Sequence, residues 1–206
     1  MKIYQWWDAS VPNSHILNYK WRERCTNSSI FNKGNILPFD CGYTERLNTL
    51  QDPKDYDLIY HAEISEEKLK GYACMPNNGQ APLVNQKVLD MLLELCPDEF
   101  QYFPVTIVGE NPKHPPFENH DYFLINICQT VDGIDKEQSD IVYFDNGDVR
   151  DIKNLILKKD MRHFCISRLK NSLVDIVVSE TVVKAFKKTK INGVKFELLG
   201  ETTFVE

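Results

Sequence analysis

Apolar runs long enough to cross a membrane are missing from this 206-residue sequence. A transmembrane helix needs about 20 apolar residues, whereas apolar stretches such as residues 91–93 and 125–128 have the length of a strand or of one helix face. The first ten residues also lack the basic start, apolar centre and small-residue cleavage site of a signal peptide. We therefore expect a soluble, cytoplasmic protein with no membrane partner.

Closely spaced cysteines and glycine-rich loops are missing too. The nine glycines form neither a P-loop nor a G-x-G-x-x-G turn, so no motif predicts a nucleotide cofactor. No two cysteines lie closer than 16 residues, which favours free thiols in a reducing compartment over disulfides or a zinc site. The six cysteines are Cys25, Cys41, Cys74, Cys96, Cys128 and Cys165.

The patterns of a catalytic or metal centre are absent as well. The sequence has no G-x-S-x-G elbow, and the histidine pair His114 and His120 lies in a polar, proline-rich stretch without a neighbouring cysteine. His163 falls in an apolar, strand-like run, where a structural histidine is more common than a general base. We predict that the chain is not an enzyme and requires no metal or cofactor.

Charge is unevenly distributed along the chain, whose net charge is -6. An acidic total disfavours nucleic-acid binding, which depends on concentrated Lys and Arg. Residues 132–151 hold seven acidic and two basic residues, a net of -5, whereas residues 152–206 hold eleven basic and six acidic ones, a net of +5. The acidic residues of segment 132–151 are Asp132, Asp135, Glu137, Asp140, Asp145, Asp148 and Asp151.

The acidic segment has two interpretations. In the plainer one it is a solvated loop and hairpin tip; in the other it is a patch that meets basic residues of a protein partner and steers their encounter. Within it, Asn146-Gly147 separates two apolar runs, which predicts a hairpin closed by a type I′ turn with two positive φ angles.

Helical spacing of apolar residues predicts two main helices, at about residues 86–95 and 180–189. Asn85 and Ser179 precede them and can cap their first turns. The second helix should end near Asn192-Gly193. Strands are expected in the apolar runs at residues 2–7, 57–63, 70–74, 100–108, 121–128, 141–144, 152–157, 163–169, 173–178 and 194–199. The fold class is therefore α+β, with a largely antiparallel sheet that carries two helices.

A strand, a capped helix and a second strand occur twice, over residues 82–107 and 176–196. This pattern fits a duplicated β-α-β unit, and it equally fits the chance occurrence of two such units in a mixed domain.

Three tryptophans, Trp6, Trp7 and Trp21, are the remaining features of interest, because tryptophan is common both in cores and at the centres of interfaces. Neighbouring residues of a strand point to opposite faces. We expect one of Trp6 and Trp7 to be buried and the other to be open to a partner.

The ordered set of segments in the second part of the chain resembles an immunity protein family of bacterial polymorphic toxin systems, formerly described only as a domain of unknown function. The matching segments are 81–90 (APLVNQKVLD), 99–105 (EFQYFPV), 122–127 (YFLINI), 131–135 (VDGID), 163–169 (HFCISRL), 176–180 (IVVSE) and 193–196 (GVKF). Ser139, which follows the fourth segment, also matches. The resemblance covers about residues 80–198. It implies an α+β immunity domain over residues 81–206, with residues 1–80 as a variable region packed on that domain or part of it.

The resemblance implies a cytoplasmic antidote that binds and neutralises a cognate toxin by stoichiometric contact. Asp132, Asp135 and Arg168 lie in the matching segments, but the family assigns them no chemistry. The competing hypotheses are a small hydrolase that reverses a toxin's modification and a general interaction domain. The oligomeric state is left open, a homo-oligomer included.

Overall fold

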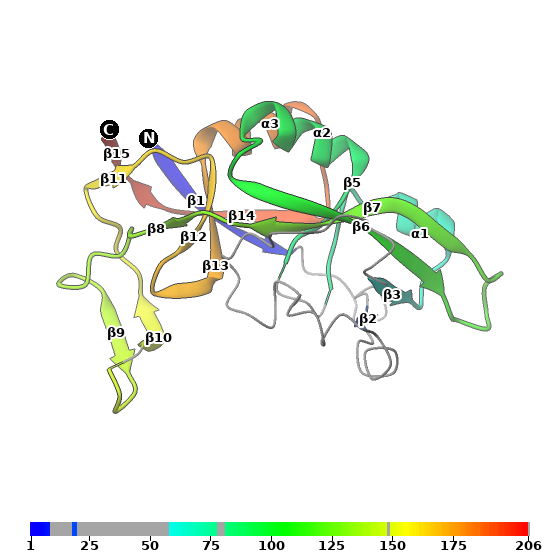
Figure 1. Cartoon of the computed structure of the whole chain (residues 1–206), viewed down its shortest axis with the longest axis horizontal. Coiled ribbons are helices and arrows are strands. Elements are labelled where there is room, and N and C mark those ends of the chain that lie inside the picture. The colour runs from blue at the N-terminus through cyan, green and yellow to red at the C-terminus, as the bar shows by residue number, and fades with distance from the viewer. Residues whose placement is uncertain (9–17, 20–57, 78–80, 148, 206) are drawn as a thin grey trace, which may run out of the picture.

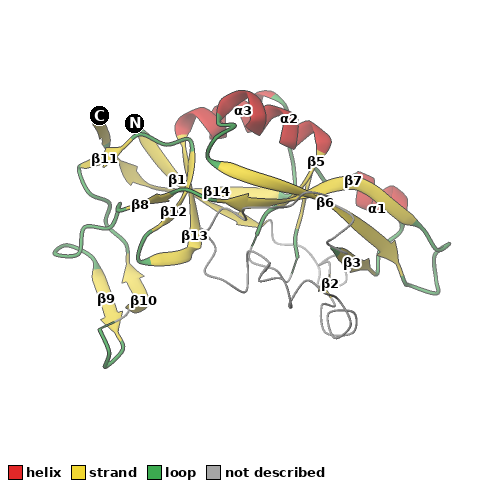
Figure 2. Ribbon diagram, viewed as in Figure 1, coloured by secondary structure: helices red, strands yellow, loops and turns green. Residues whose placement is uncertain are grey.

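The computed structural model describes residues 1–8, 18–19, 58–77, 81–147 and 149–205. Of these residues, 50% lie in strands and 16% in helices. The strands form two larger sheets, and helices α2 (Gln86–Leu95) and α3 (Glu180–Lys188) lie side by side over one side of them (Figure 1, Figure 2). The low helix content confirms a sheet-rich fold with two main helices, but the single sheet that the sequence predicts is replaced by two.

The first sheet has five strands in the order β14-β1-β13-β12-β8. Its pairings are antiparallel except that of β12 with β8, which is parallel. The strands are β1 (Lys2–Asp8), β8 (Thr130–Val131), β12 (Ile166–Leu169), β13 (Ser172–Ser179) and β14 (Val194–Glu201). The N-terminal strand therefore lies between two strands from the end of the chain.

The second sheet has six strands in the order β2-β3-β6-β7-β5-β4, and here β3 and β6 form the parallel pair. These strands are β2 (Asn18–Tyr19), β3 (Ile59–Ala62), β4 (Cys74–Met75), β5 (Leu83–Asn85), β6 (Phe100–Gly109) and β7 (Glu118–Ile127). Two short pairs complete the described sheets: β9 (Asp140–Tyr143) with β10 (Val149–Asn154), and β11 (Asp160–Arg162) with β15 (Thr203–Val205).

Helix α2 confirms its prediction, because the Asn85 side chain accepts the N–H of Val88 at 3.2 Å. Helix α3 also begins where expected, although the Ser179 side chain makes no capping hydrogen bond. The α3 helix ends at Lys188, four residues before Asn192. A third helix, α1 (Glu66–Lys70), was not predicted, and the strand expected over residues 70–74 is reduced to Cys74–Met75.

The two β-α-β units have the same topology. In the unit β5-α2-β6, the two strands are parallel to each other and flank β7, which is antiparallel to both. In the unit β13-α3-β14, the strands flank β1 in the same way. This match of topology is what a duplication predicts, and a common origin of the two units remains a hypothesis.

Three apolar clusters hold these layers together. The largest lies beneath α2 and α3 and joins both sheets through residues such as Leu92, Ile125, Ile166 and Phe186. A second packs Leu69 of α1 against Leu124 on the other face of the six-stranded sheet. The third surrounds Phe164 near the short pairs. Burial of each large apolar side chain contributes about 1.5–3 kcal/mol, so the shared cluster under the helices makes the two sheets one body.

The two sheets also meet through the backbone, where the segment before β14 touches β4. The N–H of Cys74 donates to the Asn192 carbonyl at 3.1 Å. The Asn192 side chain accepts the N–H of Ala73 at 2.8 Å and donates to the Gly71 carbonyl at 2.6 Å. This junction fixes the start of β14 relative to the other sheet.

Candidate functional site

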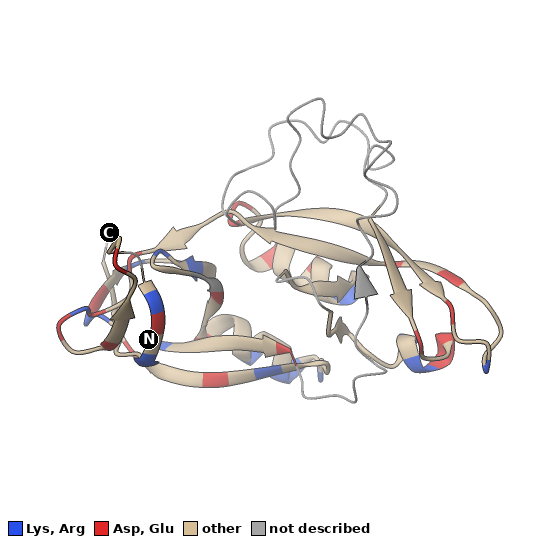
Figure 3. Cartoon of the chain, turned by 90° about the horizontal axis from the view of Figure 1, so that it is seen from below, with Lys and Arg blue, Asp and Glu red and all other residues tan. Residues whose placement is uncertain are grey.

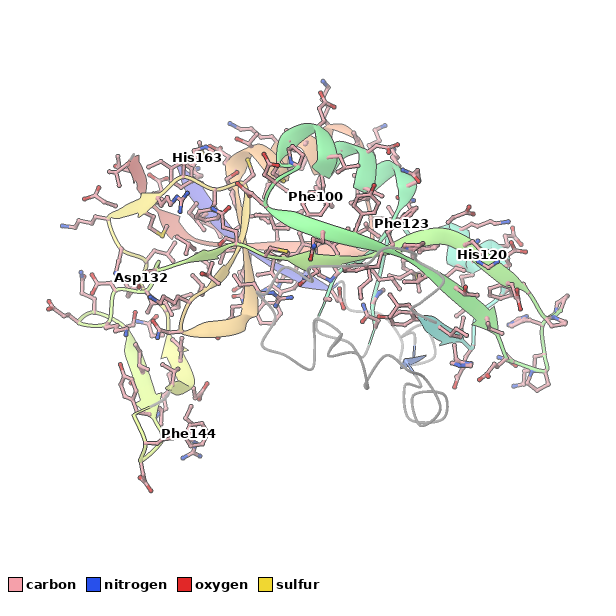
Figure 4. The ribbon with its side chains drawn as sticks, viewed as in Figure 1. Phe100, His120, Phe123, Asp132, Phe144 and His163 are labelled. Atoms are coloured by element: carbon pink, nitrogen blue, oxygen red, sulfur yellow. The ribbon has the colours of Figure 1, made fainter. Side chains whose placement is uncertain are left out.

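The β9–β10 hairpin extends away from both sheets (Figure 1). At its base, Ile141 and Ile152 pack partly buried against the apolar cluster around Phe164. At its tip, Tyr143 and Phe144 leave 46% and 54% of their surface exposed. Figure 4 shows Phe144 near the far end of the hairpin. The hairpin therefore presents two large aromatic side chains that the core does not use.

The turn of this hairpin differs from its prediction. The N–H of Gly147 donates to the Phe144 carbonyl at 2.9 Å, and Gly147 has a φ of +88°. Asn146 does not share a positive φ, so the turn is not of type I′. Asn-Gly still marked the position of the hairpin correctly, because the glycine supplies a left-handed residue in the loop.

The acidic residues divide into two groups in the structure. Asp140, Asp145 and Asp151 are exposed on the hairpin, and Glu137 is exposed just before it. Asp132 and Asp135 lie instead in the segment that joins the hairpin to the five-stranded sheet. Asp148 lies outside the described residues.

Asp132 and Asp135 organise the base of the hairpin. Lys158 donates to the Asp132 carboxylate at 2.7 Å, and this hydrogen bond lowers the pKa of Asp132. Asp135 accepts the backbone N–H groups of Glu137 and Gln138, each at 3.1 Å. These contacts give both aspartates a local structural role. Figure 3 shows that acidic and basic residues are interspersed along the described ribbon.

Trp6 and Trp7 point to opposite faces of β1, as the alternation predicts. Trp6 is 5% exposed and packs edge-on against Phe186 of α3 and Phe196 of β14, with ring centroids 5.1 and 5.6 Å away. Trp7 is 45% exposed. The interpretation of Trp6 as a partner contact is therefore corrected, because its ring is part of the core. Trp7 stays a candidate, and Trp21 lies outside the described residues.

Arg168 is fully buried in β12, and its backbone N–H donates to the Gln129 carbonyl at 3.0 Å. Burying a guanidinium costs free energy, which pairing and hydrogen bonds inside the protein must offset. Its position inside the five-stranded sheet gives this family-motif residue a place in the interior rather than on a contact surface.

Sequence reasoning missed a cluster of polar groups between α2 and β12. The Glu99 carboxylate accepts the backbone N–H of Cys165 at 2.9 Å and that of Ile166 at 2.6 Å. Burial raises the pKa of Glu99, and the two backbone hydrogen bonds oppose that rise. The cluster also contains the thiols of Cys96 and Cys165, which share a hydrogen bond. This bond raises the pKa of Cys96 and lowers the pKa of Cys165.

This cluster is the arrangement nearest to a catalytic one in the described residues. A thiol of lowered pKa is a feature of nucleophilic sites, where a cation or a helix N-terminus stabilises the thiolate. The charge of Glu99 has the opposite effect and raises the pKa of Cys165. Here, however, the carboxylate is engaged by two backbone N–H groups, and Cys165 itself is directed at the Leu95 carbonyl at 3.8 Å. The geometry supports a structural link between the end of α2 and the start of β12.

Metal-ligating side chains do not gather in the part of the chain that the structure describes: no group of three or more His, Cys, Asp or Glu residues is placed to hold an ion there. Among the same residues, no helix is both long and apolar enough to span a membrane.

Comparison with known proteins completes the description of the site. No curated protein matches the chain. Residues 53–201 match the immunity protein family Imm11. The match begins in the segment that leads to β3 and ends with β14, so it contains most of both sheets, the three described helices and the β9–β10 hairpin. The chain belongs to the Imm11 family of immunity proteins.

Proposed function

We propose that this chain is a cytoplasmic antidote that binds one molecule of a cognate protein toxin and blocks it by contact, without catalysis. Membership of an immunity family gives the class of partner. The observation that carries the mode of action is the projecting β9–β10 hairpin, which exposes Tyr143 and Phe144 at its tip.

The tip has the composition of an interface centre. Aromatic residues dominate the small set of side chains that provide most of the binding energy at protein interfaces. Exposed together on a hairpin, Tyr143 and Phe144 can enter a concave surface of a partner, whereas the partly buried Ile141 and Ile152 hold the base against the body. A base fixed in this way limits the conformational entropy that binding must remove.

The charges of the hairpin set the kind of partner. The hairpin carries three exposed aspartates, with Asp145 in the turn, Asp151 on β10 and Asp140 at the base of β9, and they form an acidic rim behind the aromatic tip. The basic residues Arg150 and Lys153 lie on β10 beside them. Such a rim favours a basic surface on the toxin and speeds the encounter more than it strengthens the complex. Occlusion of the toxin's own functional surface by the hairpin would then neutralise it.

The proposal gives different kinetic results for the tip and for the rim. Replacing Tyr143 and Phe144 with alanine should raise the dissociation rate about 30-fold or more, which corresponds to about 2 kcal/mol for a hot spot. Reversing Asp140 and Asp145 to lysine should mainly slow association and weaken its dependence on salt. The measurement is surface plasmon resonance against the toxin encoded beside the gene of this chain.

A matched control is Tyr102→Ala. Tyr102 is also a large exposed aromatic residue, but it lies on β6 of the six-stranded sheet, away from the hairpin. This variant should bind the toxin with unchanged rates. Equal losses in the control and in the tip variant would place the contact elsewhere.

A further inference from the structure

Among the described strands, β14 is the outermost strand of the five-stranded sheet on one side. Within the described residues, β14 pairs with β1 on one side and with no strand on the other. An edge strand presents unpaired N–H and C=O groups that can accept another strand. Leu198, which is 52% exposed, is one of the most exposed large apolar residues of the described chain, and it lies on this edge.

We propose that β14 is the interface of a symmetric dimer, in which the β14 strands of two copies pair in antiparallel fashion and join two five-stranded sheets into one. The inference does not depend on the proposed toxin binding. It rests on the order of charged and apolar residues along β14, which favours one alignment of the two strands.

The regular part of β14 is short and has a defined midpoint. Leu198 pairs with Tyr4 and Gly200 pairs with Ile3, so Leu199 is a bulge that interrupts the ladder. The regular stretch is therefore residues 194–198, and its central residue is Phe196. Two copies related by a two-fold axis through this midpoint place Phe196 opposite Phe196 of the second copy.

In this register, the remaining residue pairs across the dimer match in charge or in apolar character. Lys195 lies opposite Glu197 of the second copy, and the symmetry produces that ion pair twice. Val194 lies opposite Leu198 of the second copy, also twice. Because side chains alternate along a strand, the apolar pairs share the face on which Phe196 packs against α3, and the charged pairs share the other face.

The charges also disfavour the neighbouring register. Within one chain, the Lys195 ammonium lies 3.7 Å from the Glu197 carboxylate. In the dimer centred on Phe196, the four charges of the two copies alternate in sign. A shift of the centre by one residue to Glu197 would put two glutamates opposite each other, which is destabilising across a strand pair.

The test is a charge-swap series studied by sedimentation velocity over a wide range of concentrations. The wild-type chain should show a concentration-dependent monomer–dimer equilibrium. Glu197→Lys puts four lysines at the interface and should raise the dimer dissociation constant at least about tenfold. The double variant Lys195→Glu with Glu197→Lys restores two opposite pairs and should return the constant to within about threefold of the wild-type value.

Glu67→Lys is the matched control, because Glu67 is exposed on α1 and the substitution changes the net charge by the same amount. It should leave the dimer unchanged, and thermal melting should show that all variants are folded. A wild-type chain that stays monomeric up to about 200 µM, far above the range of stable complexes, would overturn the proposal. Dimers that survive Glu197→Lys, or that the double swap does not restore, would overturn it as well.

Discussion

Replacing Gly193 with alanine is expected to lower the free energy of unfolding by at least about 3 kcal/mol, a loss at the upper end of the usual range for single substitutions. Gly193 has a φ of +85°, and a Cβ atom built on it would lie 1.8 Å from the backbone oxygen of Cys74. That oxygen belongs to β4 and cannot rotate away. The substitution would therefore force apart the backbone junction between the two sheets.

Gly147 provides the matched control for this result. It has nearly the same φ, +88°, but an added Cβ would meet no atom within 4 Å. Gly147→Ala should therefore show only the strain of a left-handed alanine, about 1–2 kcal/mol. Urea unfolding of both variants measures the difference. Equal losses would mean that the close contact at Cys74 does not restrain the fold.

Replacing Glu99 with alanine should lower the free energy of unfolding by about 2–4 kcal/mol. The substitution leaves the N–H groups of Cys165 and Ile166 without their acceptor, and hydrogen bonds to charged groups contribute about 1.5–3 kcal/mol each before the cost of burying the charge is subtracted. Relief from that burial offsets part of the loss. Chemical unfolding at neutral pH measures the effect.

The pH dependence of Glu99→Gln tests the same site in another way. Because the folded state raises the pKa of Glu99, the folded protein holds this proton more tightly than the unfolded chain does. The stability that protonated Glu99 contributes is fully present below the pKa that Glu99 has in the unfolded chain. It is lost as the pH rises through the pKa of Glu99 in the folded protein. The stability advantage of the wild type over Glu99→Gln should therefore shrink as the pH rises from acidic to neutral. An advantage that grows over that range would show a lowered pKa instead.

Local signals predicted the elements that carry their own start and stop information. Helix α2 follows from Asn85 and the helical spacing of its apolar residues, and the β9–β10 hairpin follows from Asn146-Gly147 between two apolar runs. Helix α1 escaped prediction because it has five residues and buries only Leu69. Its signal was present in Ser65, whose side chain accepts the N–H of Lys68, and in the acidic first turn.

Long-range pairing could not be read from the sequence. The position of β1 between β13 and β14 depends on contacts between residues more than 160 positions apart, such as Ile3 with Ser179. The same contacts decide which tryptophan is buried, because Phe186 and Phe196 close over Trp6 and leave Trp7 exposed. The exposure of Tyr143 and Phe144 is likewise set by where the hairpin leaves the body. The sequence predicted a strand over residues 141–144 and gave no signal for the exposure of these two side chains.

The most direct test of the central claim is a titration of the purified chain against the toxin encoded beside its gene, with binding and toxin activity followed in the same samples. A contact inhibitor predicts that activity falls linearly with added chain and ends at one equivalent, together with saturation of binding. Full protection at amounts far below one equivalent would show turnover and would contradict the proposed mechanism.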